Sequence, residues 1–196
     1  MRQEKDFLIG KKSALKKLEN AMNKGQVDPG ILSILNILNK SDDYYTSSSC
    51  YGRIVLLEIP TIGDKKEAKF LGKWHRTITV NELLSASKNS KDGQLWLLSQ
   101  SPILHIVSNS NNAADKILKI SIACGFKNSG IKSLGKRIVV EVLSTERLDS
   151  PIGKNKELFC NNKHLNLLVH ISNEIIKKST LKLKKFETRI QKDLSI

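Results

Sequence analysis

The order of the expected helices and strands is the feature that most constrains the fold of this chain. Apolar side chains recur at helical spacing in residues 7–22, 31–38, 79–88, 113–124 and from about 157 onward. Runs rich in apolar and β-branched residues indicate strands at 44–46, 53–59, 70–76, 94–99, 103–107 and 137–144. The strands come in pairs between helices rather than in strict alternation. We therefore expect an α/β fold with a mixed sheet flanked by helices, not a Rossmann domain.

Residues at the expected helix ends agree with these boundaries. Gly25 is placed to end the first helix. Thr79 and Glu82 have the spacing of a capping box, and Asp28 before Pro29 is typical of an N-cap followed by proline at the first helical position. In the last helix, the predicted buried stripe is Leu165, Leu168, Val169, Ser172, Ile175 and Ile176.

The length of 196 residues favours one domain, spanning 1–196, with a basic C-terminal helical segment from about residue 155. No apolar run reaches the ~18 to 20 residues of a membrane span, and the first residues lack the apolar stretch of a signal peptide. We therefore expect a cytoplasmic protein with no membrane partner. For the oligomeric state, which the sequence does not determine, we favour a monomer.

The charge balance points to a polyanionic partner. Lysine and arginine exceed aspartate and glutamate by 33 to 19, which leaves a formal net charge of +14, and the pI is about 9.7. Such values are typical of proteins that bind nucleic acid. Only 5% of the residues are aromatic, so contact with backbone phosphates fits better than stacking on single-stranded bases. The most concentrated basic sites are the lysine pairs at 11/12, 16/17, 177/178 and 184/185, which we expect to form one stripe.

Common cofactor and metal patterns are absent from the sequence. It has no Gly-rich turn between a strand and a helix, no phosphate-binding Gly-Lys-Ser/Thr and no His-Glu-x-x-His. Its three cysteines form no Cys-x-x-Cys pair, so neither a disulfide framework nor a zinc ribbon is indicated. Cys160 and His164 stand four residues apart, but two ligands do not make a site. We expect no metal.

The segment from Thr46 to Arg53, Thr-Ser-Ser-Ser-Cys-Tyr-Gly-Arg, stands out. It reads as a Ser-rich turn over residues 47–52 between two strands. It also offers consecutive hydroxyls and backbone N–H groups followed by a guanidinium, which together can hold a carboxylate or a phosphate. The residues alone leave both interpretations open.

This segment resembles the (S/T)xSSCxGR signature of the wybutosine-synthesis methyltransferase family, TYW3 in eukaryotes and Taw3 in archaea. Further segments resemble motifs of the same family in the same order. They are Lys24–Asp28, Trp74-His75, Ile103–Ile106, Gly125–Gly130 and Asp149–Ile152. The chain departs from the pattern at Lys127, where an arginine is usual, and at Glu141, where a basic residue is expected.

The resemblance implies a non-Rossmann α/β methyltransferase. Its expected reaction moves a methyl group from S-adenosylmethionine to N-4 of the demethylwyosine-type base 3′ of the anticodon of phenylalanine tRNA. A sulfonium methyl donor is intrinsically reactive, so the enzyme mainly has to align the reactants, exclude water and remove one proton from the nitrogen. The tRNA substrate accounts for the positive charge.

The resemblance also supplies site residues. Asp28 and His105 are the catalytic candidates, because either side chain can take the proton. The residues expected to bind or enclose the cofactor or substrate are Thr46, Ser48, Ser49, Cys50, Gly52, Arg53, His75, Asn128, Ser129 and Gly130. We expect these residues to converge on one pocket.

Each catalytic candidate also has a structural interpretation, and two other functions are compatible with the sequence. Asp28 is also a suitable helix N-cap, and His105 lies between two apolar residues as a core histidine does. A non-catalytic basic RNA-binding protein accounts for the charge without catalysis. A Cys-His hydrolase, the less favoured alternative, accounts for Cys50. The first predicts no affinity for S-adenosylmethionine, and the second predicts inactivation by thiol alkylation.

Overall fold

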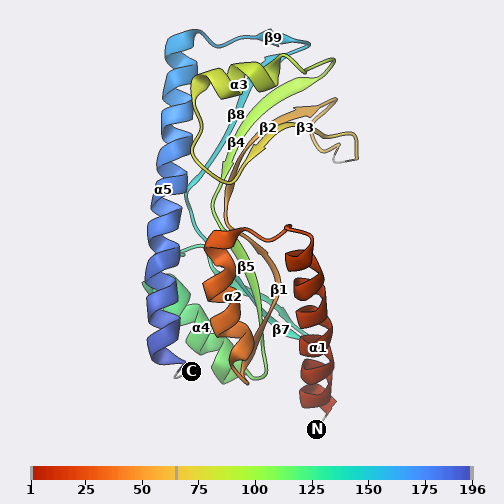
Figure 1. Ribbon diagram of the computed structural model, residues 1–196, viewed down its shortest axis with the longest axis vertical. Helices are drawn as coiled ribbons and strands as arrows, with labels where there is room; N and C mark the ends of the chain where they lie inside the picture. The colour runs from red at the N-terminus through yellow and green to blue at the C-terminus, as the bar shows by residue number, and fades with distance from the viewer. Residues whose placement is uncertain (1, 65, 195–196) are drawn as a thin grey trace. The chain divides into compact units, whose positions relative to one another are not determined.

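In the computed structural model, which describes residues 2–64 and 66–194, the chain forms two compact units. Unit 1 comprises Met1–Tyr51, Pro102–Thr145 and Thr180–Ile196. Unit 2 comprises Gly52–Ser101 and Glu146–Ser179. Each unit is therefore assembled from segments that are distant in the sequence (Figure 1). The expected single domain over 1–196 stays a prediction.

Unit 1 is built on a four-stranded antiparallel sheet with the strand order β1-β5-β7-β6. Its strands are β1 (Tyr44–Cys50), β5 (Ile103–Ser108), β6 (Gly130–Leu134) and β7 (Ile138–Leu143). Its helical elements are α1 (Arg2–Asn23), the 3₁₀ turn η1 (Pro29–Ile31), α2 (Leu32–Lys40), α4 (Asn111–Ala123) and the C-terminal part of α5 (Asn162–Asp193).

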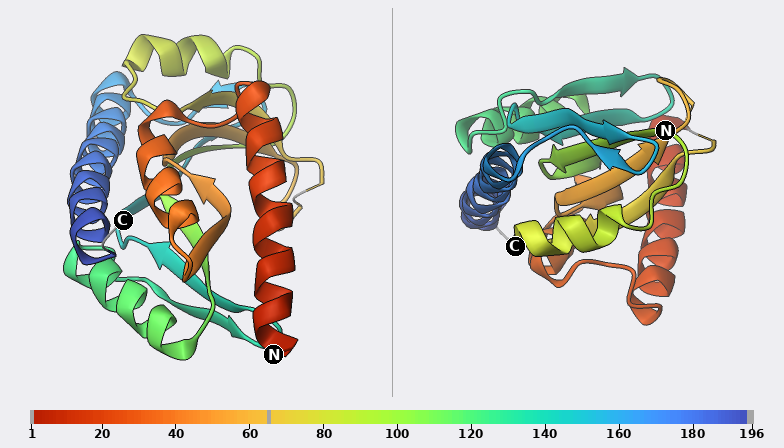
Figure 2. Two further views of the ribbon diagram at one scale, coloured as in Figure 1. Left: turned by 60° about the horizontal axis from the view of Figure 1, so that its bottom comes forward. Right: turned by 90° about the horizontal axis from the view of Figure 1, so that it is seen from above.

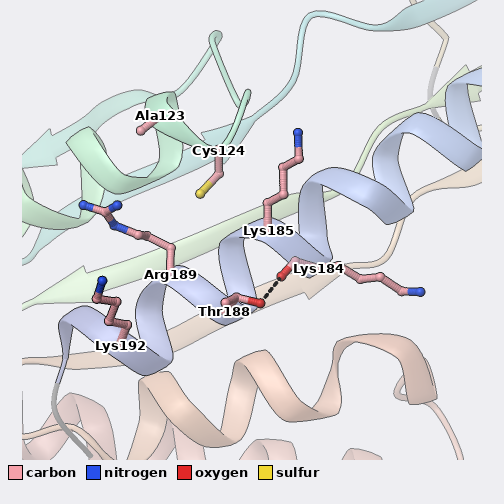
Figure 3. A pocket seen from close by; sticks show the side chains of 7 residues that line it. All are labelled: Ala123, Cys124, Lys184, Lys185, Thr188, Arg189 and Lys192. Carbon is pink, nitrogen blue, oxygen red and sulfur yellow. Dashed lines mark hydrogen bonds between the residues drawn. The ribbon is translucent and has the colours of Figure 1, made fainter.

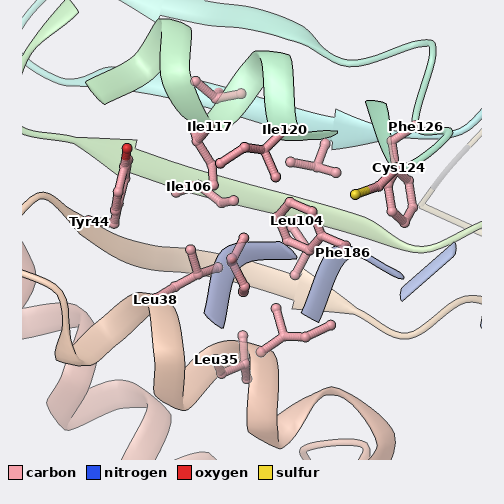
Figure 4. Packing of buried hydrophobic residues seen from close by; sticks show 14 of the residues in the cluster. Leu35, Leu38, Tyr44, Leu104, Ile106, Ile117, Ile120, Cys124, Phe126 and Phe186 are labelled. Carbon is pink, nitrogen blue, oxygen red and sulfur yellow. The ribbon is translucent and has the colours of Figure 1, made fainter. Parts of the chain in front are cut away.

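Helices pack on both faces of this sheet. Successive side chains of a strand point to opposite faces, and here both faces carry apolar side chains that need to be buried. Leu104 of β5 lies on the face that packs against α2, α4 and Phe186 of α5 (Figure 4). Val107 lies on the other face, where it packs with Tyr45 and with Phe7 of α1. Figure 1 and the left view of Figure 2 show α1 and the C-terminal part of α5 well apart, with β1 between them.

Unit 2 contains a five-stranded antiparallel sheet with the order β3-β2-β4-β8-β9. The strands are β2 (Arg53–Ile59), β3 (Lys69–Trp74), β4 (Gln94–Gln100), β8 (Arg147–Lys154) and β9 (Glu157–Leu158). Helix α3 (Val80–Ser87) and the N-terminal part of α5 pack on it, burying Leu83, Leu165 and Val169 with strand residues such as Leu97. Of the helices that the structure describes, none has the length and apolar character needed to cross a bilayer.

The expected α/β class and the non-Rossmann arrangement are confirmed, and every described strand pair is antiparallel. Gly25 ends α1 with a positive φ of 63°. The predicted stripe of α5, from Leu165 to Ile176, is buried at all six positions. Periodicity predicts these helices well, because a helix that packs on a core carries its apolar residues at helical spacing on the buried face.

Three local predictions are wrong, each where long-range pairing determines the structure. The expected turn over residues 47–52 is a strand as far as Cys50, because β5 pairs with it. Strands β6 and β8 are not among the strands expected from the sequence, since their polar residues and Pro151 weaken the strand pattern. The last helix begins at Asn162 rather than near residue 155, because Glu157 and Leu158 pair with β8.

The predicted capping box of α3 is confirmed. The Thr79 hydroxyl accepts a hydrogen bond from Glu82 N at 3.2 Å, and Glu82 Oε2 accepts one from Thr79 N at 2.8 Å. Arg76 Nη2 lies 2.6 Å from Glu82 Oε1. The hydrogen bond from Arg76, assisted by that from Thr79, lowers the pKa of Glu82 from 4.5 to about 2.

This shift predicts a pH-dependent contribution of Glu82 to stability. A carboxyl whose pKa is lowered by folding stabilises the native state fully above pH 4.5, and the stabilisation is lost as the pH falls to about 2. The Glu82→Gln variant should therefore unfold at lower urea than the wild type at pH 7, and the difference should vanish near pH 2. The exposed Glu67→Gln is the control for loss of a surface charge. A difference that persists at pH 2 would contradict the prediction.

Candidate active site

A cavity of about 290 Å³ in unit 1 brings together two of the sequence segments singled out above. Its lining includes Asp28 from the segment before η1 and Lys17 from α1. The β1 residues Thr46, Ser47, Ser48 and Ser49 also line it. A carboxylate, an ammonium group and several hydroxyls thus share one small cavity. It joins the segment around Asp28 to the Ser-rich segment.

A bulge in β1 sorts the hydroxyls of this cavity. The register places Thr46 opposite Ile106 and Ser48 opposite His105, so Ser47 is one extra residue on β1. Thr46 is buried toward α2, where its N–H donates to Asn39 Oδ1 at 2.8 Å and its hydroxyl accepts from Asn39 Nδ2 at 3.0 Å. Ser48 is exposed on the opposite face of the sheet. Thr46 therefore anchors the strand.

Asp28 does not use its side chain as a helix cap. Its backbone is extended at the N-cap position of η1, but the side chain makes no capping hydrogen bond. Asp28 Oδ2 instead accepts a hydrogen bond from Tyr51 N at 3.4 Å. The ring of Tyr51 packs so closely over Gly30 that a Cβ there would lie 2.6 Å from it. The capping interpretation is thus wrong, and these contacts hold the carboxylate beside the end of β1.

His105 is not a core histidine, which was its structural alternative. Its side chain is 27% exposed on the face of the sheet opposite to Leu104. Its Nδ1 lies 2.6 Å from Ser48 Oγ and its Nε2 lies 2.9 Å from Glu141 Oε2. Both ring nitrogens are therefore engaged, and His105 does not belong to the described residues that line the cavity.

Glu141, which departs from the family pattern, completes the surroundings of His105. Its side chain is 15% exposed, and its Oε1 accepts a hydrogen bond from Lys132 Nζ at 3.1 Å. Burial acts to raise the pKa of Glu141, but the hydrogen bonds from Lys132 and His105 outweigh it and leave the pKa below its usual value. Glu141 is thus a carboxylate at neutral pH.

The loop from Asn128 to Gly130 is held by β7 and does not line this cavity. Asn128 N donates to Leu143 O at 3.1 Å, and Ser129 Oγ accepts from Leu143 N at 3.1 Å. Gly130 begins β6 and lies opposite Glu141 in the register. These contacts give the loop a structural function at the end of β7. Its expected function as a wall of the site stays a prediction.

Cys50 ends β1 with a reduced, half-buried thiol. The remaining candidates belong to unit 2. Gly52 is buried with a positive φ of 97°, and His75 directly follows β3. Arg53 Nε donates to Gln100 Oε1 at 2.8 Å, and its guanidinium lies 5.9 Å from the ring centroid of Phe70. The expected convergence of all candidates on one pocket stays a prediction.

Comparison with known proteins decides the family. The model of the methyltransferase TYW3 family matches residues 10–192 of the 196. This chain belongs to the TYW3 methyltransferase family. The resemblance found in the sequence is thereby confirmed, and so is the expectation that the chain is an enzyme of the methyltransferase class.

Several TYW3-type proteins resemble the chain over nearly its full length. A Pyrococcus abyssi protein named tRNA(Phe) 7-((3-amino-3-carboxypropyl)-4-demethylwyosine(37)-N(4))-methyltransferase 1 is 44% identical over 97% of this chain and 99% of its own. A Methanocaldococcus jannaschii protein named as an enzyme of the same kind is 41% identical over 94% of this chain and 96% of its own. A solved structure of the PH1069 protein from Pyrococcus horikoshii is 44% identical, with a TM-score of 0.92 over 97% of this chain and 98% of that one.

A second cavity, which we call the basic groove, lies between α4 and α5. Its volume is about 510 Å³, and its basic lining residues are Lys184, Lys185, Arg189 and Lys192. Figure 3 shows Arg189 extending from α5 toward the end of α4 at Cys124. Sequence reasoning missed the groove, because the contact between α4 and α5 is not visible in either helix alone. Lys184 and Lys185 line this groove, whereas Lys17 of α1 lines the first cavity. The expected single stripe of lysine pairs stays a prediction.

Proposed function

We propose that this chain methylates N-4 of the demethylwyosine-type base that follows the anticodon of phenylalanine tRNA, with S-adenosylmethionine as the methyl donor. The observation that carries the proposal is the 44% identity over 97% of the chain with an enzyme named for that reaction. The cavity described above supports it, because it gathers a carboxylate, a lysine and hydroxyls from two motif segments. Because the substrate is a tRNA, we place the reaction in the cytoplasm.

The groups that line the cavity fit the chemistry of the donor. S-Adenosylmethionine supplies an activated methyl group on a positively charged sulfur, and it carries a carboxylate, an ammonium group and ribose hydroxyls. Lys17 and the hydroxyls of Ser47 and Ser49 can hold a carboxylate, and Asp28 can hold an ammonium group or a hydroxyl. The cavity of about 290 Å³ is close to the lower end of small-ligand pockets, about 300 to 1,000 Å³.

The site residues take functions that follow from these positions. Asp28 and His105 serve the reacting nitrogen, which has to lose a proton when it gains the methyl group. Ser48 and Ser49 provide hydroxyls inside the cavity. We propose that Thr46, Cys50, Gly52, Arg53 and His75 complete the binding site and that Asn128, Ser129 and Gly130 enclose it. The expectation that the site uses no metal stays a prediction.

Two measurements test the proposal against its alternatives. Calorimetric titration should show binding of S-adenosylmethionine, and mass spectrometry of nucleosides from tRNA(Phe) carrying the demethylated precursor should show the gain of one CH₂. Iodoacetamide inactivation that the donor does not prevent would favour a Cys-His hydrolase. Absence of donor binding together with tight tRNA binding would favour a non-catalytic RNA-binding protein.

The basic groove supports the choice of tRNA as partner. Four cationic side chains line it, and only Arg189 among them has a described carboxylate partner, Asp193. Closely spaced lysines and arginines in a concave surface are suited to the phosphates of a nucleic-acid backbone. We therefore propose that one segment of the tRNA backbone lies in the basic groove.

Charge reversal in the basic groove is expected to weaken tRNA binding. The double variant Lys185→Glu/Lys192→Glu should lower the affinity by about tenfold or more near physiological salt. It should also reduce the slope of log affinity against log salt by about 0.7 to 0.9 for each phosphate that the variant no longer neutralises. Filter binding at several salt concentrations measures both quantities. Affinity for S-adenosylmethionine should stay unchanged.

The matched control is Lys5→Glu/Lys12→Glu on α1, which changes the net charge by the same amount. If both double variants weaken tRNA binding equally, overall charge rather than the groove determines affinity. If only the α1 variant weakens it, the backbone lies along α1 instead.

A further inference from the structure

Four polar side chains form an unbroken hydrogen-bonded row across the sheet of unit 1. Ser48 of β1 lies 2.6 Å from His105 Nδ1, and His105 Nε2 lies 2.9 Å from Glu141 of β7. Lys132 of β6 donates to the same Glu141 at 3.1 Å. The register pairs Ser48 with His105 and His105 with Glu141, so the side chains lie directly opposite one another on one face.

The neighbours of this row on the same face are mostly apolar. Tyr45, Val107 and Val139 are aligned on one side of it and pack with Phe7 of α1. Ile103, opposite Leu143 and Cys50 in the register, follows on the other side. Polar side chains that are partly removed from water between apolar neighbours are costly unless they are paired. The paired His105 and Glu141, 27% and 15% exposed, therefore form the partly buried centre of the row, and its two ends, Ser48 and Lys132, are exposed.

The hydrogen bonds determine where the protons of the row are. Glu141 is ionised, since its pKa lies below its usual value, and a carboxylate only accepts. His105 Nε2 must then carry the proton that it donates to Glu141. In the neutral ring Nδ1 has a lone pair, so it accepts the hydroxyl proton of Ser48. The lone pairs of Ser48 Oγ are left for another donor.

Only one end of the row reaches the cavity. Ser48 lines it together with Asp28, whereas His105 and Glu141 do not belong to its described lining. A base at His105 can therefore act on a molecule in the cavity only through the hydroxyl of Ser48.

We propose that Ser48 is the catalytic residue that takes the proton from N-4 of the base, and that it passes its own hydroxyl proton to His105. This step rests on the proposed function. The N–CH₃ bond forms as the S–CH₃ bond breaks, and the bonding pair stays on sulfur. The N–H bond breaks as a new Oγ–H bond forms on Ser48, while the former Oγ–H proton becomes the Nδ1–H of His105. Glu141 and Lys132 are positioning residues that hold the ring and balance its charge.

The inference gives Asp28 and Ser48 different functions. Asp28 holds and orients the reactants at the cavity, and Ser48 carries the proton away from it. It also explains why a glutamate is useful at position 141. A carboxylate accepts the hydrogen bond from His105 Nε2–H, whereas lysine and arginine side chains can only donate.

The test compares Ser48→Ala with Ser48→Thr, which retains a hydroxyl, in single-turnover methyl transfer at saturating donor and tRNA. We expect Ser48→Ala to lower the rate by about 10²- to 10⁴-fold with little change in the affinity for donor or tRNA, and Ser48→Thr to recover most of the rate. Ser133→Ala, an exposed serine on β6, is the matched control and should behave as wild type. Wild-type rates for Ser48→Ala, or a loss of donor affinity with an unchanged saturated rate, would overturn the proposal.

Glu141→Gln tests the row through a readout that does not need methyl transfer. In ¹H–¹⁵N NMR of the wild-type imidazole, His105 should be the Nε2–H tautomer, and Glu141→Gln should mix the tautomers and slow the saturated rate. A wild-type ring with Nδ1–H would overturn the relay even in an active enzyme. A wild type with the expected tautomer but no methyl transfer would instead contradict the proposed function.

Discussion

Replacing Asp28 by alanine is expected to lower methyl transfer by about 10²- to 10⁴-fold, the usual contribution of a positioned acid–base or electrostatic group. Asp28 contributes a carboxylate to the cavity lining. Because its side chain makes no capping hydrogen bond, the free energy of unfolding should change by less than the ~0.5 to 2 kcal/mol that loss of a cap costs. Mass spectrometry of tRNA hydrolysates measures the first quantity, and urea unfolding measures the second.

Asp115→Ala is the matched control for Asp28→Ala. Asp115 is an exposed carboxylate on α4 that pairs with Lys119, outside both cavities. Its loss should leave methyl transfer unchanged. A folded Asp28→Ala protein with wild-type activity would remove Asp28 from the mechanism. A large loss of stability without loss of activity would restore a structural function for this residue.

Phe186→Ala is expected to destabilise the protein by about 3 to 5 kcal/mol, the cost of deleting a buried aromatic ring and leaving a cavity. Phe186 is 0% exposed, and its ring lies 5.9 Å from that of Phe126 in an edge-to-face arrangement. It brings α5 into the core beside α2 and α4 (Figure 4). Urea unfolding, with hydrogen exchange of the α4 amides as a local probe, measures the effect.

Phe159→Ala is the matched control for the ring deletion. Phe159 is 68% exposed, so its loss should change the free energy of unfolding by no more than about 0.5 kcal/mol. If Phe186→Ala proved as mild as the control, α5 would not be part of the unit 1 core. Because Lys185 neighbours Phe186, the variant should also weaken tRNA binding in the basic groove.

Several site segments could be predicted from the sequence. The Ser-rich segment carries a motif whose residue types are set by their chemistry, so it is visible in the sequence. The function of each residue within it was less visible. Thr46 anchors the strand to Asn39, whereas Ser48, two residues later, faces His105. Thr46 and Ser48 point to different faces because β1 has a bulge between them. The bulge arises from the pairing of β1 with β5, in which Ser48 lies opposite His105, 57 residues away.

The sequence by itself determined the helices, the capping box and the family, because periodicity, capping and motif residues are local and each is read within about a dozen positions. Only the tertiary structure decided that the Ser-rich segment is a strand, that Asp28 is not a cap and that His105 lies behind Ser48. It also decided that Lys184 and Lys185 join Arg189 and Lys192 in one groove with α4. The physical reason is that these features depend on hydrogen bonds and packing between residues far apart in the chain, and such contacts leave no local pattern.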